Sequence, residues 1–475
     1  MNLSLFLPET FLTITSITLL VLMLLSKETL SKTVYPVMVF SGAALVAACF
    51  LSLHASGSLF SATYRVDLFS QGFKFILSIA FFIAILLSEE MIAIPKSKEA
   101  EYFLFMTTSV FGMLMLTSAA DILTLYVSLE LSSYSLYLLA ALRQKRRNAE
   151  SSVKYLIFGA AASGVLLWGL SLITGLSGAT SLIEIAKNAP VLSAQPAFAL
   201  GLAFTTFAFL FKLSGFPAHF WAPDVYESAA TPAVTFIATA SKAAAVAIFI
   251  RVFMIAGISH PFVTALGVIA FISMTLGNCV ALVQTDVKRL LAYSSIAQAG
   301  YILVGLLSGS FEGYSSAFFY AFAYVLMNAG VFLVTLMVAK SIGHDNPQIV
   351  HFDGLAERAP FLSLILLLSL LSLAGIPPLV GFTGKWILFS AAMDKGHWFL
   401  VLWGVLNSVV SLFYYLTLVK HAYLEKPKVA TPLAVPLFIK ALGLALFCSI
   451  VLLGIFPNAF ITFAQQAITM TALKA

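Results

Sequence analysis

The stretch Phe209-Leu-Phe-Lys212-Leu-Ser-Gly-Phe-Pro217-Ala-His-Phe-Trp-Ala-Pro-Asp-Val-Tyr-Glu227 interrupts two strongly apolar segments, the second of which continues to Lys242. Proline lacks a backbone N–H and its ring clashes with the carbonyl four residues earlier, so Pro217 predicts a helix break that frees carbonyls near Leu213. Within a membrane such a break survives only where protein covers it or where it lines a wet cavity. A lysine at membrane depth costs about 3 kcal/mol, and this stretch contains two. We interpret the stretch as part of an ion path.

The composition of the 475 residues is that of a polytopic membrane protein. The chain is 61% hydrophobic and 10% charged, with a mean hydropathy of +1.01, whereas soluble domains carry about 25% charged residues. The net charge of +6 does not indicate a nucleic-acid partner, because no basic patch is interleaved with aromatic residues. The sequence has no Walker loop, no GxGxxG motif and no metal-ligand spacing of cysteines, so we expect no cofactor and no metal on this chain.

The fold class predicted is an all-α membrane protein with about fourteen spans, each of which needs about 20 apolar residues. The first apolar segment has no basic residue before Lys27, so it is expected to remain as a span rather than to be a cleaved signal peptide. The approximate cores are Leu5–Leu25, Val34–His54, Phe73–Leu87, Tyr102–Thr117, Ile122–Leu142, Val153–Thr174, Phe198–Gly215, Pro232–Phe253, Pro261–Val283, Leu290–Leu307, Tyr314–Ala339, Phe361–Phe389, Trp398–Leu418 and Pro436–Phe456.

Charges in the loops predict the orientation. With the N-terminus outside, about fifteen basic residues fall in cytoplasmic loops and about six on the opposite side, as the positive-inside rule requires. The cytoplasmic group contains Arg143, Lys288, Arg289 and Lys340, whereas the opposite group contains Arg251, with Lys74 at the edge of a span. We therefore expect both termini on the outer side of a bacterial inner membrane.

A weak internal repeat predicts the domain organisation. The twelfth span contains the break Gly375-Ile-Pro377-Pro378, five spans after the break at Pro217. Paired broken spans in two units of a chain indicate a transport path at the interface of inverted repeats, and an odd number of spans per unit forces the inversion. The expected units are residues 1–100 (three helices), 101–256 (first five-helix repeat), 257–425 (second, inverted repeat) and 426–475 (fourteenth helix and tail).

Four ionisable residues lie well inside predicted spans: Glu130, Lys212, Lys242 and Lys385. One carboxylate facing three lysines leaves some lysines without a counter-ion, and burial disfavours the charged form of such a group. The residues therefore suit a relay that accepts and releases protons. The alternative is a buried Glu–Lys pair that merely pins two helices.

Other polar residues carry weaker signals. His219, Asp224 and Glu227 follow the first break at the cytoplasmic end and are expected to form either a solvated, capped turn or a proton entrance. Polar residues between 293 and 301, which include Gln298 and Tyr301, are candidates for the lining of a water path. The predicted interface or packing aromatics are Trp221 and Trp386, and the residues assigned to a solvated connector are His344, Asp345, His351 and Asp353.

Several long motifs resemble the antiporter-like membrane subunits of respiratory complex I, and the resemblance covers essentially the whole chain. The motifs are Phe211–Tyr226, Thr231-Pro232 with Ser241-Lys242-Ala243, Lys288–Ala297, and Gly375-Ile-Pro-Pro followed by Gly381-Phe-Thr-Gly-Lys385. The sequence is most similar to the N-type subunits of bacterial NADH–quinone oxidoreductase. Lys385 stands where M-type subunits carry a glutamate, and no long lateral helix of the L type follows the fourteenth span.

The resemblance implies a proton-translocating subunit of a NADH:quinone oxidoreductase of the respiratory chain, a translocase whose FMN, iron–sulfur clusters and quinone would be held by partner subunits. It implies that Glu130 and Lys212 form a coupling pair, that Lys242 is the central relay and that Lys385 serves the outward half. Pro217, His219, Tyr301 and Pro377 would support this path. One departure from the family pattern is Gln298, because many relatives have a histidine there and glutamine cannot carry a proton.

Three alternatives remain open from the sequence. A sodium/proton antiporter subunit of the Mrp type, or a membrane subunit of a related hydrogenase, would share the fold and the lysine–glutamate pattern. A stand-alone solute transporter would need a substrate pocket at the broken helices. A scaffold without transport activity would tolerate neutral substitution of the four charged residues.

Overall fold

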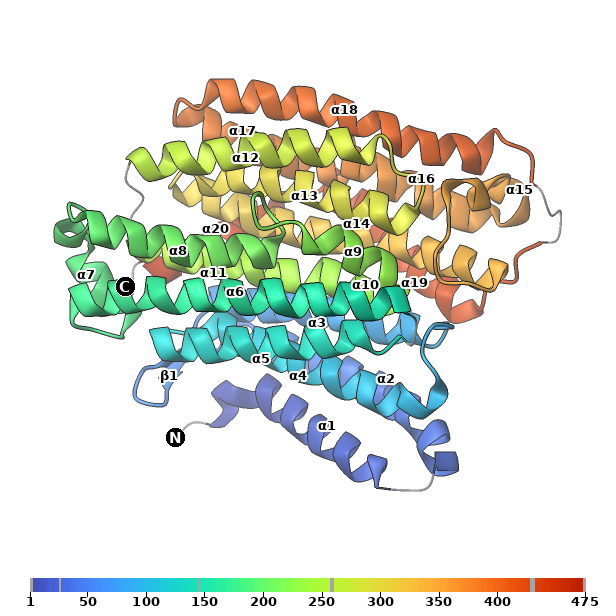
Figure 1. Ribbon diagram of the computed structural model, residues 1–475, viewed down its shortest axis with the longest axis horizontal. Coiled ribbons are helices and arrows are strands. Elements are labelled where there is room, and N and C mark those ends of the chain that lie inside the picture. Colours follow the sequence, from blue (N-terminus) through green and yellow to red (C-terminus); the bar gives the residue numbers. More distant parts are fainter. Residues whose placement is uncertain (1–2, 25–26, 144–145, 257–259, 428–431, 473–475) are drawn as a thin grey trace.

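The computed structural model of the chain is a bundle of long, roughly aligned helices (Figure 1) and describes residues 3–24, 27–143, 146–256, 260–427 and 432–472. The α-helices are α1 (Leu7–Met23), α2 (Lys27–Leu51), α3 (Leu68–Ser88), α4 (Glu99–Ser118), α5 (Ile122–Ala141), α6 (Arg146–Ser177), α7 (Leu182–Leu192), α8 (Pro196–Leu213), α9 (Trp221–Ser228), α10 (Thr231–Phe236), α11 (Lys242–Ala256), α12 (His260–Ala281), α13 (Val287–Leu306), α14 (Phe311–Ile342), α15 (Leu355–Arg358), α16 (Pro360–Ala374), α17 (Val380–Asp394), α18 (Trp398–Tyr423), α19 (Leu437–Ile455) and α20 (Asn458–Ala472). A π-helical segment, η3 (Ile237–Ser241), joins α10 to α11, and three short 3₁₀ helices are η1 (Leu3–Phe6), η2 (Lys96–Lys98) and η4 (Ile349–Phe352).

The predicted helical membrane fold is confirmed. Within the described ranges, eleven helical stretches are long and apolar enough to cross a membrane, and the apolar helices α1 and α16 are shorter. The count of fourteen spans stays a prediction. The chain also forms elements that we did not expect, namely the amphipathic helix α20, the short helix α7 and a hairpin of β1 (Gly57–Leu59) and β2 (Tyr64–Val66).

Corresponding contacts in the two halves support the predicted repeats. Asp121 N-caps α5 and bridges to Ser181, and Asp286 N-caps α13 and bridges to Gln348. In the predicted repeats, the helices α4, α5, α6, α8–α9 and α10–α11 are the counterparts of α12, α13, α14, α16–α17 and α18. In Figure 1, α4 and α12 begin at opposite ends of the bundle, as expected for inverted units.

Two glycines let the first two helices of each repeat approach closely. Gly112 and Gly277 each lie nine residues before the capping aspartate. A Cβ atom at Gly112 would lie 2.6 Å from the backbone nitrogen of Ser132, and one at Gly277 would lie 2.6 Å from that of Ala297. Since real Cβ atoms do not approach backbone this closely, both helix pairs require glycine. The close approach fixes α5 and α13, whose polar residues line the site described below.

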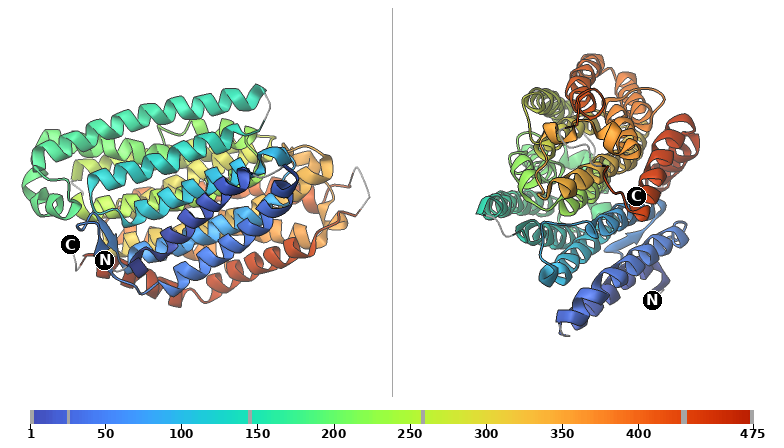
Figure 2. Two further views of the ribbon diagram at one scale, coloured as in Figure 1. Left: turned by 90° about the horizontal axis from the view of Figure 1, so that it is seen from below. Right: turned by 90° about the vertical axis from the view of Figure 1, so that its right-hand side faces the viewer.

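The ends of the helices separate the basic residues into two groups. Arg143 follows α5 and Lys288 begins α13 at one end of the bundle, whereas Arg251 lies near the end of α11 at the other. The views along and across the bundle in Figure 2 agree with this alternation and show α1 beginning, and α20 ending, at the same end. This separation is the one predicted from the loop charges.

Candidate functional site: two helix breaks and their lysines

The first break separates α8 from α9. Helix α8 ends at Leu213, and Ser214 adopts a left-handed conformation with φ 57°. The indole Nε1 of Trp221, at the start of α9, donates to the carbonyl of Phe211 across the break at 2.9 Å. The prediction of a break at Pro217 is confirmed, and Trp221 is a buried packing residue that stabilises it.

The side chain of Lys242 inserts into this break. Its ammonium donates to the Leu213 carbonyl at 3.0 Å and to the Ser214 hydroxyl at 2.5 Å. On the opposite side it donates to the Ser295 hydroxyl of α13 at 2.9 Å. Lys242 is buried, and its ammonium satisfies one of the carbonyls that the end of α8 leaves free.

Lys212 and Glu130 lie beside this break but do not form an ion pair in the described structure. The Lys212 ammonium donates to the hydroxyls of Ser132 and Ser133 at 2.8 and 2.7 Å. Glu130 is buried on the same helix, α5, about one turn away, and neither carboxylate oxygen has a hydrogen-bond partner among the described residues. The two groups expected to form a coupling pair therefore lie near each other without forming an ion pair. We call Glu130 and Lys212 the open pair.

The second break separates α16 from α17. Gly375 takes the left-handed conformation with φ 93°, and a Cβ atom there would lie 3.1 Å from Lys385 Cδ. The Lys385 ammonium donates to the carbonyls of Leu373 and Ala374, each at 3.0 Å. It also lies 4.4 Å from the centroid of the Tyr301 ring. Lys385 thus binds the end of α16 as Lys242 binds the end of α8.

Gln298 connects the two lysine sites. It lies on α13 about one turn after Ser295, and its Nε2 donates to the Leu373 carbonyl at 3.1 Å. The Tyr320 hydroxyl donates to its Oε1 at 2.5 Å. Since Lys385 donates to the same Leu373 carbonyl, polar groups extend from Lys242 along α13 to Lys385.

The predictions for the polar residues after the first break were partly wrong. His219 is 4% exposed and stacks against Phe216 and Phe220, so it is not part of a solvated turn. The Arg289 guanidinium donates to Asp224 and to Glu227, at 2.9 Å each. Tertiary contacts with α13, which local sequence does not reveal, partly bury this acidic pair.

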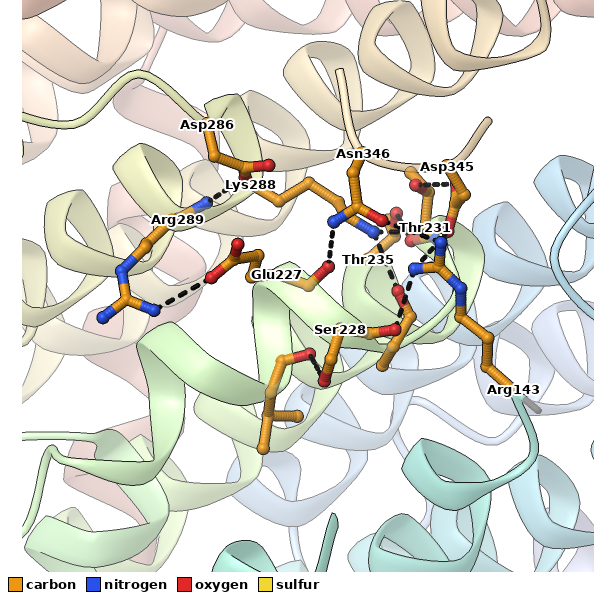
Figure 3. A network of polar contacts seen from close by, with 12 residues as sticks. Arg143, Glu227, Ser228, Thr231, Thr235, Asp286, Lys288, Arg289, Asp345 and Asn346 are labelled. Atoms are coloured by element: carbon orange, nitrogen blue, oxygen red, sulfur yellow. Dashed lines mark hydrogen bonds and ion pairs between the residues drawn. The ribbon is translucent and has the colours of Figure 1, made fainter. Parts of the chain in front are cut away.

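The assignment of Asp345 to a solvated connector was also wrong. Its carboxylate is 2% exposed and accepts hydrogen bonds from the backbone nitrogen and hydroxyl of Thr231, at 3.0 and 2.5 Å. Lys288 lies 3.2 Å and Arg143 3.7 Å from it. Figure 3 shows this network, which joins the ends of α5, α10, α13 and α14.

A second buried Glu–Lys arrangement was missed by the sequence analysis, which placed Lys74 at the edge of a span. Helix α3 begins at Leu68 because Asp67 caps it, so Lys74 lies inside the span. Lys74 and Glu9 are both fully buried, with 2.9 Å between nitrogen and Oε1. Tyr64 donates to Glu9 at 2.6 Å and accepts from Lys74 at 2.8 Å. Neither residue lies in a long polar motif that could have indicated this pair.

Known proteins show the same architecture. The family described as NADH:quinone oxidoreductase/Mrp antiporter, TM, matches residues 119–411. The protein named NADH-quinone oxidoreductase subunit N 2 of Syntrophobacter fumaroxidans is 43% identical over 98% of this chain and 99% of its own length. The protein of the same name from Opitutus terrae is 38% identical over 98% of this chain and 96% of its own.

Solved structures agree. A chain of respiratory complex I from Thermus thermophilus with bound aureothin superimposes with a TM-score of 0.84 at 30% identity, covering 96% of this chain and 99% of that one. A chain of the Mrp complex from Dietzia shares the fold, with a TM-score of 0.87 at 19% identity over 99% and 97% of the two chains. With its two broken helices, its buried lysines and these relatives, the chain belongs to the subunit N family of NADH–quinone oxidoreductases, the antiporter-like membrane subunits of respiratory complex I.

Proposed function

We propose that this chain moves protons across the membrane through Glu130, Lys212, Lys242 and Lys385 while partner subunits oxidise NADH and reduce quinone. One observation carries the proposal. In the described structure, each of the three ammonium groups is held by hydroxyls or by carbonyls at a helix break, with no carboxylate in an ion pair. An adjacent carboxylate would favour the charged form of a lysine, whereas burial without such a counter-ion disfavours it, so each lysine is able to release its proton.

The coupling step is the closing and opening of the Glu130–Lys212 pair. Opposite charges about 4 Å apart at an effective dielectric of about 20 attract by about 4 kcal/mol. When Glu130 approaches, this attraction retains the Lys212 proton. When a neighbouring subunit's field draws Glu130 away, the N–H bond of Lys212 breaks, and the proton passes to the amine that Lys242 becomes once it has given its own proton toward Lys385. Reprotonation of Lys212 from the cytoplasmic side, past His219, resets the first half.

The outward half uses the second break. The proton leaves Lys242 beside Ser295 and reaches Lys385 along α13, with Gln298 and Tyr301 orienting the connecting polar groups. The Gln298 side chain does not take up and release protons, so proton transfer past it requires water. The breaks at Pro217 and Pro377 supply the carbonyls that make both lysine sites possible.

The proposal places the chain in a bacterial inner membrane with both termini on the outer side, in contact with lipid and with other membrane-arm subunits. The flavin, iron–sulfur clusters and quinone belong to those partners, and the transported ion is the proton rather than sodium. The names of the relatives support the partner subunits, and the separation of basic residues between the two ends of the bundle supports the orientation.

Lys242→Met tests the proposal, because methionine keeps the length of the side chain and removes its proton. In inverted membranes that contain the assembled complex, NADH-driven acidification, followed with a pH-sensitive dye, is expected to lose the contribution of this subunit. Lys242→Arg should be impaired too, since arginine does not release its proton. Normal acidification by both variants at normal assembly would reject the relay, and acidification that depends on sodium would reject the proton as the transported ion.

A further inference from the structure

The helix that carries Lys242 is anchored at both ends by aspartates from other parts of the chain. At its end, Arg251 donates to Asp67 at 3.3 Å and to the Thr117 carbonyl at 2.7 Å. At its start, Thr231 donates to Asp345 through its backbone nitrogen and its hydroxyl. Between the two anchors the helix is entirely buried, so its placement along its axis is set at these two points.

Asp345 supplies the hydrogen-bond acceptor that the start of this helix lacks. The N-cap position is Ala230, which has no side-chain acceptor, and Pro232 follows Thr231. The first backbone N–H groups of a helix need outside acceptors, and a carboxylate there is favoured by the helix dipole. Asp345, which lies 114 residues further along the chain, therefore acts as the missing cap.

The same carboxylate also fixes the start of α13. Lys288, fully buried, donates to Asp345 and to the Ala229 carbonyl at 2.8 Å. Arg143, at the end of α5, donates to the Ser228 carbonyl at 2.8 Å. Without the aspartate charge, two buried cations would face each other, and each would lose its counter-ion. Figure 3 shows these groups gathered around one point.

These contacts connect Asp345 with Lys242 through two helices. Lys242 follows Thr231 by eleven residues and Ser295 follows Lys288 by seven, about 16.5 and 10.5 Å at 1.5 Å per residue. The π-helical segment η3 ends directly before Lys242, and π segments occur frequently at functional sites. Because α10, η3 and α11 follow one another without a break, a shift at Thr231 would be transmitted to Lys242 and would change its hydrogen bonds to Ser214 and Ser295.

We propose that Asp345 is a positioning residue for Lys242: its charge holds the starts of α10 and α13 in the register that places the Lys242 ammonium between the first helix break and Ser295. The proposal rests on the proton relay described above. It assigns a role in transport to Asp345 in the loop after α14. This residue binds Thr231, which lies about three helical turns before Lys242, the nearest relay lysine.

The test compares Asp345→Asn with Asp353→Asn in the assembled complex. Asp353 lies in the same connection and pairs with His421 at 2.6 Å, outside the network around Asp345, so it is the matched control. The ratio of protons pumped to NADH oxidised, measured per assembled complex, is expected to fall in Asp345→Asn to the level of Lys242→Met and to stay unchanged in Asp353→Asn. In a structure of Asp345→Asn, the Lys242 ammonium should no longer lie within hydrogen-bond distance of the Ser295 hydroxyl.

A purely structural role would lower the amount or the thermal stability of the complex while leaving that ratio and the Lys242–Ser295 hydrogen bond intact, and this result would overturn the proposal. If Asp345→Asn does not assemble, Thr231→Ala decides, because it removes one hydrogen bond and leaves every charge in place. It should lower the proton ratio, and an unchanged ratio would overturn the proposal. If Lys242→Met itself pumps normally, the relay fails instead, and the two failures are thereby distinguished.

Discussion

Two buried glutamate–lysine arrangements in this protein differ in whether the two side chains are in contact, and this difference indicates a different role for each. Glu9 and Lys74 are in direct contact, and the Tyr64 hydroxyl bonds to both. Glu130 and Lys212 are also buried but form no ion pair: serines hold the lysine, and both oxygens of the glutamate lack hydrogen-bond partners among the described residues. Burial of charge is common to both arrangements, so burial alone does not identify a proton carrier.

The difference lies in what each glutamate can do next. Closing the Glu130–Lys212 pair would satisfy an uncompensated carboxylate, and opening it leaves the lysine on two hydroxyls that already solvate it. Separating Glu9 from Lys74 would leave two buried ions without a counter-ion, and the only other hydrogen-bond partner of Lys74 among the described residues is the Tyr64 hydroxyl. The first pair therefore has two accessible states and the second has one. We infer that the first switches and that the second is a structural ion pair that links α1 to α3.

The largest expected effect on transport is that of Lys212→Ala. Removing the lysine of the open pair should lower quinone reduction and proton pumping together by about 10²-fold, the lower end of what a positioned acid–base group contributes. NADH-driven quinone reduction and dye acidification in inverted membranes measure both. Lys187→Ala, an exposed lysine of α7, is the control, and equal behaviour of the two variants would remove the distinction between buried and surface lysines.

The next largest effect is expected for Lys385→Arg, which tests whether a positive charge at this position is sufficient for proton pumping. Arginine keeps the positive charge but does not release its proton, so pumping should fall nearly as far as in Lys385→Ala. The yield of assembled complex is measured first, because Lys385 Cδ already lies close to Gly375. Lys395→Arg, at the exposed end of the same helix, controls for the substitution. Full pumping by assembled Lys385→Arg would make Lys385 a structural cation like Lys74.

The smallest effect on transport is expected in the closed pair. Lys74→Met alone strands Glu9 and should destabilise the protein by about 3–5 kcal/mol, the cost of breaking a buried pair. Adding Glu9→Gln removes the stranded charge and keeps an acceptor for Tyr64, so thermal stability should largely recover. Protons pumped per electron should remain normal in the double variant. Loss of pumping there, at normal stability, would make Glu9 and Lys74 part of the path.

The helix breaks could be predicted from sequence because their cause is local. Pro217 and Pro377 interrupt their spans wherever these helices pack, and the lysines near them are conspicuous in apolar segments. Helix α20 was missed for the opposite reason: it contains no long apolar run, and it buries only a narrow face that includes Ala464, Ala467 and Ile468. A helix stabilised by one face against its neighbours leaves little trace in mean hydropathy.

The polar networks could not be predicted, since their partners are distant along the chain. Asp345 appears in the sequence as one more acidic residue of a polar loop, yet Thr231, Lys288 and Arg143 bury it from as far as 202 residues away. In the sequence, Glu9 is simply an acidic residue near the start of the first span. In the structure, Tyr64 and Lys74 contact it and bury it. Only the tertiary packing of the helices brings these groups together.

The central claim is that the open pair, and not buried charge in general, couples the protein to proton movement. Glu130→Gln against Glu9→Gln tests it most directly, because both substitutions keep shape and remove one buried negative charge. The measurement is protons pumped per NADH oxidised, together with the rate of quinone reduction, in complexes assembled to equal amounts. We predict that Glu130→Gln loses both while Glu9→Gln retains both, and normal pumping by Glu130→Gln with loss in Glu9→Gln would contradict the account.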